Sequence, residues 1–275
     1  MAAGTYRIGV IAPAGRFSKT SAEQARALAA IRPGRPVELV FHPQCFLRSG
    51  HFAGTDAERT RAVVEVGNDP SFDAVWFARG GYGSNRIAVA AVSGLSDAAL
   101  KKPWLGYSDM GFMLAALLNA GAAQAAHGPM VADANRFNGA EPVMRALDWL
   151  VDSKEAACEP AALKAPSLAF NLAVLTAMMG TPLEPDFTGR VLMLEEVSEH
   201  HYRIDRMMYQ LTSTPSVRRA AGIMLGRCSA IPENDPPFEQ TEEEIARHWC
   251  EVSGLRYLGR ADIGHDSGNK VVPFR

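Results

Sequence analysis

A serine lies where a predicted strand runs directly into a predicted helix. Residues 103–107 have the composition of a buried strand and residues 109–119 the apolar spacing of a helix, so Ser108 occupies the junction. On such a turn the hydroxyl is exposed at the carboxyl edge of the sheet, and the next backbone N–H groups are free at the helix N-terminus. This geometry suits a nucleophile. The pattern is not a full G-x-S-x-G, because Met110 stands where the second glycine would be. The alternative is that Ser108 or Asp109 only caps the helix.

A glycine-rich loop stands at another predicted junction of strand and helix. Arg79 is followed by Gly80 and Gly81, and glycines let backbone donors approach a ligand without a Cβ in the way. The loop could cradle a phosphate or form part of an oxyanion hole, and a tight turn is the alternative. It is a poor nucleotide fingerprint, because it lacks G-x-G-x-x-G and no Walker lysine follows. Arg79 is a candidate partner for the terminal carboxylate of a substrate, or one half of a structural ion pair.

A carboxylate and a histidine later in the chain complete a set for nucleophilic catalysis. Glu195 directly follows the apolar run 191–194, and a carboxylate at a strand end often faces a site. With Ser108 and His265 it offers a nucleophile, an orienting carboxylate and a general base from three separate strand ends. The oxyanion of a tetrahedral intermediate would then lie between the backbone N–H of Asp109 and one from the glycine-rich loop.

The same acidic segment raises the question of a metal site. Glu195 and Glu196 are followed closely by Glu199, His200 and His201. Adjacent histidines in an extended segment point to opposite faces, and the H-E-x-x-H spacing of a helical zinc site is absent. We therefore expect neither a metal nor another cofactor.

Strands and helices alternate in the first half of the chain, which predicts an α/β fold with a mostly parallel sheet between two layers of helices. The pattern changes after about Trp149, and residues 151–165, rich in Ala, Glu, Lys and Pro, are interpreted as a linker. We expect an N-terminal domain over residues 1–150 that carries the nucleophile and a C-terminal domain over residues 166–275 that carries the Glu and the His. Strands are expected at 6–13, 36–41, 74–78, 103–107, 190–194 and 221–225, and helices at 21–31, 56–66, 84–92, 109–119, 172–179, 204–211 and 242–252.

The composition of the chain argues against some classes of binding partner. The 28 Lys and Arg nearly balance the 30 Asp and Glu, and no basic run appears, so nucleic acid is not an expected partner. No apolar stretch approaches the roughly 18 to 20 residues that span a bilayer, so no membrane is expected either. Residues 1–16 show no export signal, and the four scattered cysteines favour reduced thiols. We therefore expect a cytoplasmic protein.

Ten short segments, taken in order, resemble the LD-carboxypeptidase family, the S66 serine peptidases that trim murein tetrapeptides. These segments are 11–15, 52–55, 79–83, 106–109, 127–130, 171–172, 180–182, 194–196, 202–207 and 264–265. The resemblance implies that Ser108 is the nucleophile, Glu195 the carboxylate of the triad and His265 the base. Residues 169–170 are Ala-Phe where the family commonly has Gly-Gly, and the sequence stops at Arg275 where relatives usually continue. We expect both differences to affect specificity more than the triad.

The resemblance also implies a fold and a reaction. It implies an N-terminal domain like that of class I glutamine amidotransferases, a smaller swivelling C-terminal domain and a homodimer. The implied reaction is hydrolysis, through an acyl-enzyme, of the bond between an L-residue and the terminal D-alanine of a murein tetrapeptide in peptidoglycan recycling. The alternatives are a self-immunity peptidase that cleaves a peptide–nucleotide antibiotic, a catalytically silent muropeptide-binding protein, and a phosphate or nucleotide binder that uses residues 79–84.

Overall fold

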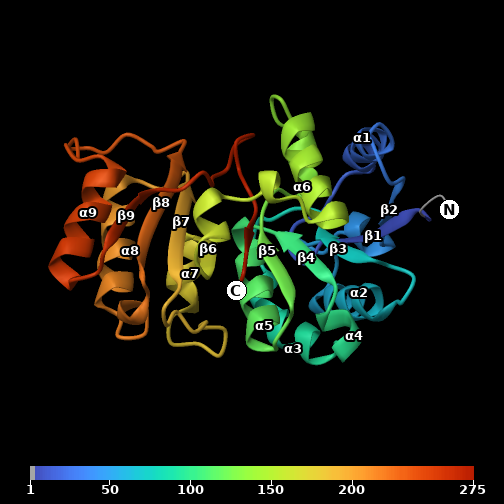
Figure 1. Cartoon of the computed structure of the whole chain (residues 1–275), viewed down its shortest axis with the longest axis horizontal. Coiled ribbons are helices and arrows are strands. Elements are labelled where there is room, and N and C mark those ends of the chain that lie inside the picture. Colours follow the sequence, from blue (N-terminus) through green and yellow to red (C-terminus); the bar gives the residue numbers. More distant parts are fainter. Residues whose placement is uncertain (1–3) are drawn as a thin grey trace.

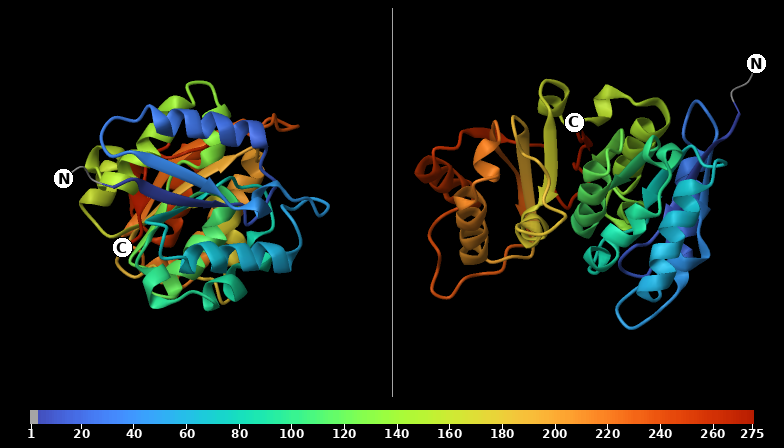
Figure 2. Two further views of the ribbon diagram at one scale, coloured as in Figure 1. Left: turned by 90° about the vertical axis from the view of Figure 1, so that its right-hand side faces the viewer. Right: turned by 90° about the horizontal axis from the view of Figure 1, so that it is seen from below.

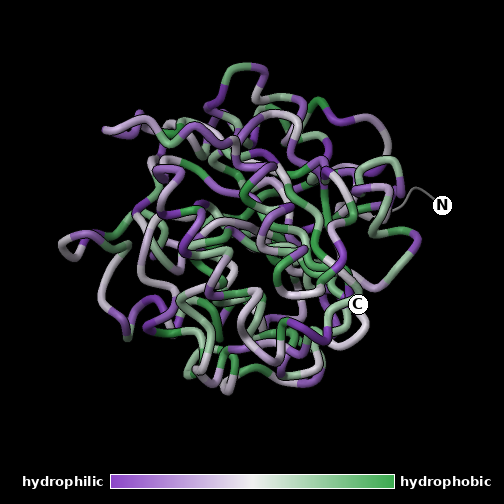
Figure 3. The backbone as a smooth tube through the Cα atoms, turned by 90° about the vertical axis from the view of Figure 1, so that its left-hand side faces the viewer, coloured by the Kyte–Doolittle hydropathy of each residue, from purple (hydrophilic) through white to green (hydrophobic). Residues whose placement is uncertain are grey.

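The computed structural model describes residues 4–275, which fold around two β-sheets. Residues 1–3, which begin both the predicted domain 1–150 and the segment in which no export signal is expected, lie outside the described residues. The two sheets lie side by side with their helices (Figure 1). Backbone segments of hydrophobic residues lie mainly inside the molecule, and hydrophilic segments lie around its periphery (Figure 3).

The first sheet has six strands in the order β10-β5-β4-β3-β1-β2. They are β1 (Tyr6–Ile11), β2 (Val37–Phe41), β3 (Ala74–Phe77), β4 (Pro103–Gly106), β5 (Gln124–His127) and β10 (Val272–Pro273). Neighbouring strands from β1 to β5 pair in parallel, and β10 pairs antiparallel with β5. All residues of β3 are buried, as expected of a parallel strand that is covered on both faces.

The helices between these strands form two layers. The first layer contains α1 (Lys19–Ala30) and α6 (Ala140–Asp152), which contact each other. The opposite layer contains α2 (Asp56–Asn68), α3 (Ala88–Ser93), α4 (Asp97–Leu100) and α5 (Gly111–Asn119) (Figure 1). The start of α2 is a capping box, in which Thr55 and Glu58 each accept a hydrogen bond from the other's backbone N–H.

The second sheet is entirely parallel, with its strands in the order β6-β7-β8-β9. They are β6 (Ser167–Asn171), β7 (Val191–Val197), β8 (Gly222–Ser229) and β9 (Tyr257–Arg260), and the helices between them are α7 (Leu172–Met178), α8 (His201–Ser213) and α9 (Glu242–Ser253). A capping box formed by Thr241 and Glu244 begins α9. In the described part of the chain no helix is long and apolar enough to cross a membrane. The two helix-covered sheets confirm the predicted α/β fold class.

Strand β10 joins the two halves of the molecule. It follows the whole second sheet in sequence but pairs with the first, where Val272 lies opposite His127. The next residue, Phe274, forms a β-bridge to Ser167 of β6, and its ring lies 5.2 Å from that of Phe170. Figures 1 and 2 show this C-terminal segment between the two halves. Residues 151–165 contain the end of α6 and two short 3-10 turns. The division at these residues remains a prediction.

We expect Phe274→Ala to destabilise the protein strongly. Its side chain is 4% exposed and packs against Phe170 between the sheets, so truncation should leave a cavity and lower the free energy of unfolding by about 3 kcal/mol. Phe137→Ala is the matched control, because Phe137 is 90% exposed and its loss should change stability by less than about 0.5 kcal/mol. Urea denaturation followed by circular dichroism measures both, and equal midpoints for the two variants would contradict this role of Phe274.

Candidate active site

The carboxyl ends of three neighbouring strands meet at one edge of the first sheet. Trp76 of β3 pairs with Leu105 of β4, and Gly106 pairs with His127 of β5, so the loops that follow start at the same level. Ligands of parallel α/β sheets bind at this edge. A pocket of about 250 Å³ lies there. Its lining residues are Arg79, Gly80, Gly81, Tyr107, Ser108, Met130, Ala132, Asp133, Asn135, Arg136 and His265.

Ser108 occupies the sharp turn that its sequence position predicts. Its φ of +59° lies in the left-handed region, which non-glycine residues seldom adopt, and it begins the 3-10 turn Ser108–Met110 that leads into α5. The glycine loop lies directly against it, because a Cβ built on Gly80 would be 3.0 Å from both Cβ and Oγ of Ser108. A backbone without a side chain is therefore required next to the serine.

The side chain of Asp109 braces the glycine loop. Its Oδ2 accepts a hydrogen bond from the backbone N–H of Ser84 at 2.9 Å, and the Ser84 hydroxyl donates to the Asp109 carbonyl at 2.6 Å. Burial raises the pKa of Asp109, and the hydrogen bonds from Ser84 oppose this effect. From the other side the fully buried Arg59 donates to the carbonyl of Gly83 at 2.9 Å and to that of Pro13. These contacts fix the C-terminal end of the loop, at Gly83 and Ser84.

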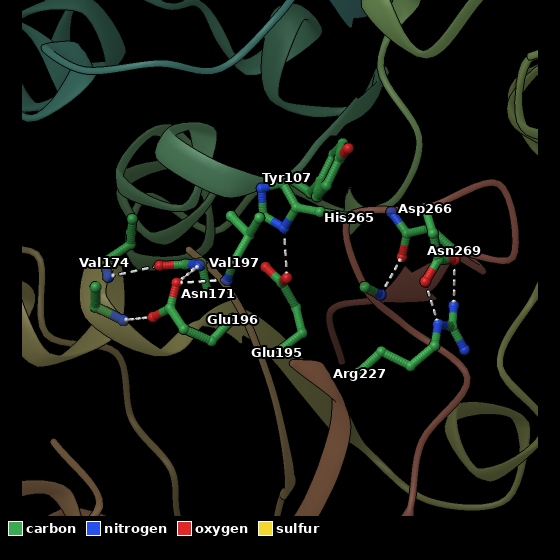
Figure 4. Close-up of polar contacts among 12 residues, drawn as sticks. Tyr107, Asn171, Val174, Glu195, Glu196, Val197, Arg227, His265, Asp266 and Asn269 are labelled. Carbon is green, nitrogen blue, oxygen red and sulfur yellow. Dashed lines mark hydrogen bonds and ion pairs between the residues drawn. The ribbon is translucent and has the colours of Figure 1, made fainter. Parts of the chain in front are cut away.

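Glu195 and His265 form a buried pair. Nδ1 of His265 lies 2.6 Å from Oε2 of Glu195, whose side chain is fully buried (Figure 4). The register between β7 and β8 shifts between Leu194 and Glu196, and such bulges redirect a side chain. A Cβ built on Gly226, in the neighbouring strand, would come within 3.0 Å of Glu195 Cβ, so glycine leaves the room that this carboxylate occupies.

The pair sets the charge state of the imidazole. Burial by itself lowers the pKa of His265, but the charge of Glu195 and its hydrogen bond outweigh burial, so the pKa is raised from 6.5. The ring of Tyr107 packs on the imidazole with centroids 4.8 Å apart. Because Glu195 engages Nδ1, Nε2 is the nitrogen left for proton transfer. His265 and Ser108 line the same pocket, and within residues 4–275 no hydrogen bond joins them.

The loop that carries His265 is clamped by an arginine. Arg227 donates hydrogen bonds to both carboxylate oxygens of Asp266 (Figure 4). It also binds Asp262. A Cβ on Gly264 or on Gly268 would lie 3.0 Å from the Arg227 side chain. The two glycines therefore let the loop close around the guanidinium and hold His265 from both sides.

A second histidine lies buried beside the pair and is neutral. His127 is fully buried, and burial lowers its pKa to about 4. Its Nε2 lies 3.2 Å from Oδ1 of Asn269, which also accepts a hydrogen bond from the backbone N–H of Gly264. The contact joins the end of β5 to the loop of His265, so it links the two halves of the molecule next to the site.

The acidic segment that begins at the end of β7 does not form a metal cluster. Glu196 points away from Glu195 and accepts hydrogen bonds from Asn171 Nδ2 at 2.7 Å and from the N–H of Ala173 at 2.8 Å (Figure 4). Burial raises the pKa of Glu196 against these bonds. Glu199 pairs with Arg203 on the surface. Among residues 4–275 no three or more His, Cys, Asp or Glu side chains are grouped to share a metal ion.

Arg79 and residues 169–170, which the sequence singles out, lie differently relative to the pocket. Arg79 is exposed and donates to the carbonyls of Gly80 and Arg16, each at 3.3 Å, and within the described residues it has no acidic partner. Ala169 and Phe170 lie in the core between the sheets, and neither lines the pocket.

Sequence reasoning missed a polar group that forms one side of the pocket. The hydroxyl of Tyr107 donates to Asp133 at 2.9 Å and accepts a hydrogen bond from Arg136 at 3.1 Å. Arg136 also binds Asp133 directly, and Asp133 accepts a further bond from the N–H of Met130 at 2.8 Å. Asp133 and Arg136 follow β5, a strand that the Ala-rich sequence of 124–127 does not predict. The signal that could have revealed them is the presence of Asp133, Asn135 and Arg136 within six residues after the segment 127–130.

The comparisons with known proteins agree over the length of the chain. A family model described as the LD-carboxypeptidase N-terminal domain matches residues 8–128, and one described as the LD-carboxypeptidase C-terminal domain matches residues 164–275. A putative carboxypeptidase of Streptomyces coelicolor is 30% identical over 98% of this chain and 88% of its own length. A probable murein peptide carboxypeptidase of Bacillus subtilis is 30% identical over 82% of this chain and 74% of its own.

Solved structures show the same fold. A muramoyltetrapeptide carboxypeptidase from Oxalobacter formigenes aligns with a TM-score of 0.82 at 24% identity, over 97% of this chain and 92% of that one. The microcin C7 self-immunity protein aligns with a TM-score of 0.80 at 15% identity, over 99% and 92%. Because the two family models cover most of the sequence and the curated relatives match nearly all of it, the chain belongs to the S66 LD-carboxypeptidase family of hydrolases.

Proposed function

We propose that this protein is a serine carboxypeptidase that removes the terminal D-alanine from murein tetrapeptides in peptidoglycan recycling. The observation that carries the proposal is the buried pair of Glu195 and His265 on the wall of a pocket that also contains Ser108. Two relatives support the substrate class: a probable murein peptide carboxypeptidase of Bacillus subtilis and a murein tetrapeptide carboxypeptidase of Pseudomonas aeruginosa. A cytoplasmic location and a homodimer are part of the same proposal.

The reaction begins with acylation of the serine. Nε2 of His265 takes the hydroxyl proton of Ser108 as Oγ attacks the carbonyl carbon before the D-alanine. Glu195 keeps the imidazole in the tautomer with its proton on Nδ1 and stabilises the imidazolium. The oxyanion lies between the backbone N–H of Asp109 and one from the loop of Gly80 and Gly81, and each such donor contributes about 3 kcal/mol.

The acyl-enzyme is then hydrolysed. The C–N bond breaks, the imidazolium of His265 gives its proton to the amine, and D-alanine leaves. Water attacks the ester carbonyl while His265 takes its proton, and that proton returns to Oγ of Ser108 as the shortened peptide leaves. Arg79 and Arg136 give the pocket positive side chains that can attract an acidic peptide.

The microcin C7 self-immunity protein shares this fold. The assay therefore tests two classes of substrate, a murein peptide and a nucleoside conjugate. A defined tetrapeptide mixture and an aminoacyl-sulfamoyl nucleoside are incubated separately with the enzyme, and products are identified by mass spectrometry. The proposal expects D-alanine from the tetrapeptide. Cleavage of the nucleoside conjugate alone would favour a self-immunity peptidase, and binding of the tetrapeptide without cleavage would favour a silent muropeptide-binding protein.

Replacing the nucleophile should abolish D-alanine release. For Ser108→Ala we expect kcat to fall by at least about 1,000-fold, because no oxygen remains to form the acyl-enzyme. Ser93→Ala is the control, since Ser93 is an exposed helix serine whose hydroxyl only contacts the Val89 carbonyl. The assay is coupled detection of D-alanine. A wild-type rate in Ser108→Ala would end this assignment.

The pH dependence should report the charge of the imidazole. His265 must be neutral to act as base, and Glu195 raises its pKa, so kcat/KM of the wild type should rise with pH through a midpoint above 6.5. Glu195→Gln removes the negative charge. We therefore expect the rise of kcat/KM to occur at lower pH and its maximum value to drop by roughly 1,000-fold. A pH profile with the same midpoint in both proteins would contradict the role of Glu195.

The space beside the serine should also be essential. Gly80→Ala introduces a Cβ 3.0 Å from Ser108 Oγ, which is tighter than normal contact, so the serine or the loop must shift. A displacement of this order should lower kcat by about 100-fold. Thermal melting provides the stability comparison, and labelling with a serine-reactive probe tests whether Oγ still reacts. Unchanged kcat in Gly80→Ala would show that the loop does not form the oxyanion site.

A further inference from the structure

The guanidinium of Arg136 is held along one edge and available along another. Nε donates to Asp133 and Nη2 donates to the hydroxyl of Tyr107, whose own proton goes to Asp133. These bonds use the edge formed by Nε and Nη2. Within residues 4–275 no hydrogen bond uses Nη1, so the edge formed by Nη1 and Nη2 still has two parallel N–H groups. Such an edge binds a carboxylate through two hydrogen bonds.

The support for this guanidinium is buried and rigid, whereas its tip is accessible. Asp133 and Tyr107 are 3% and 2% exposed, and Asp133 is fixed in turn by the N–H of Met130. The side chain of Arg136 is 37% exposed and lines the pocket. An arginine fixed in this way loses little conformational entropy when it binds an anion.

Arg136 lies on the side of the pocket where the leaving group must depart. The ring of Tyr107, which holds the guanidinium, packs on His265 at 4.8 Å. His265 gives its proton to the leaving amine, and in a terminal residue the carboxylate is separated from that amine by a single Cα. A group that binds the terminal carboxylate must therefore lie close to His265, as Arg136 does.

Arg79 stands at a different place. It bonds to the carbonyls of Gly80 and Arg16, and its Nε lies 3.2 Å from a Cβ built on Gly15. This is the side of the glycine loop, where the proposed oxyanion forms. Arg79 also has no buried acidic residue behind it within the described residues. The two arginines of the pocket thus differ in both position and support.

We infer that Arg136 binds the terminal carboxylate of the substrate through Nη1 and Nη2, and so restricts cleavage to the last peptide bond. Tyr107 and Asp133 are positioning residues for this guanidinium. The inference rests on the proposed function and assigns its leaving-group subsite. A peptide whose last residue carries an amide in place of the carboxylate lacks the charge that this subsite recognises.

The test compares two tetrapeptides that differ only in a terminal carboxylate or carboxamide. For the wild type, kcat/KM should be higher for the acid than for the amide, and Arg136→Met should lower the acid-to-amide ratio by about 100-fold. Arg136→Lys, which retains a charge but not two parallel donors, should lower it partly, mainly through KM of the acid. Release of D-alanine or D-alaninamide is measured by mass spectrometry, and circular dichroism checks the fold of each variant.

Arg79→Met is the matched control, because it removes the other guanidinium of the pocket and with it only a longer-range attraction, so it should change the acid-to-amide ratio far less than Arg136→Met does. A ratio that survives in both Arg136 variants, or one that collapses in Arg79→Met instead, would overturn the assignment while the proposed function stands. Failure of the wild type to cleave either peptide would contradict the proposed function, and the assignment with it.

Discussion

The contact between Glu195 and His265 is the interaction on which the site depends. A fully buried carboxylate is costly unless a partner offsets its lost hydration, and the imidazole is that partner at 2.6 Å. The rest of the second half is arranged around this contact. The register shift between β7 and β8 lies at the carboxylate, Gly226 of β8 leaves room for it, and Arg227 fixes the loop that carries the histidine. The pair therefore results from the packing of strands and a loop that are far apart in the sequence rather than from any short motif.

The serine belongs to the other sheet, so the halves must be held at a fixed distance. Three contacts near the pocket do this: the ring of Tyr107 on His265, the buried His127 beside Asn269, and the bridge of Phe274 to β6. Each joins an element of the first sheet to one of the second or to its last loop. The same Tyr107 also holds Arg136, so one residue next to the serine positions groups on two sides of the pocket.

The sequence predicts the framework well and the pocket wall less well. Strong β-rich runs and amphipathic helices identify most of the elements from β1 to α5, because burial on both faces imposes a pattern on each strand by itself. Strand β5 escapes prediction since Gln124–His127 is Ala-rich, and its pairing comes from neighbours on both sides. Asp133 and Arg136 are missed with it, because they become neighbours of Ser108 only through the order of strands. Nothing local in sequence could place Arg227 behind His265 either.

The place of strand β10 at the end of the sequence decides when the first sheet is completed during synthesis. The half that carries Ser108 has an open edge at β5 until residues 272 and 273 have been made, and those residues follow the entire second half. An unpaired strand edge is a surface on which other chains can add, so a nascent chain is exposed to aggregation in that interval. The serine-bearing sheet is thus completed only after the residues that supply the base. Until those two residues are made, the serine-bearing sheet lacks the strand that joins it to the second half.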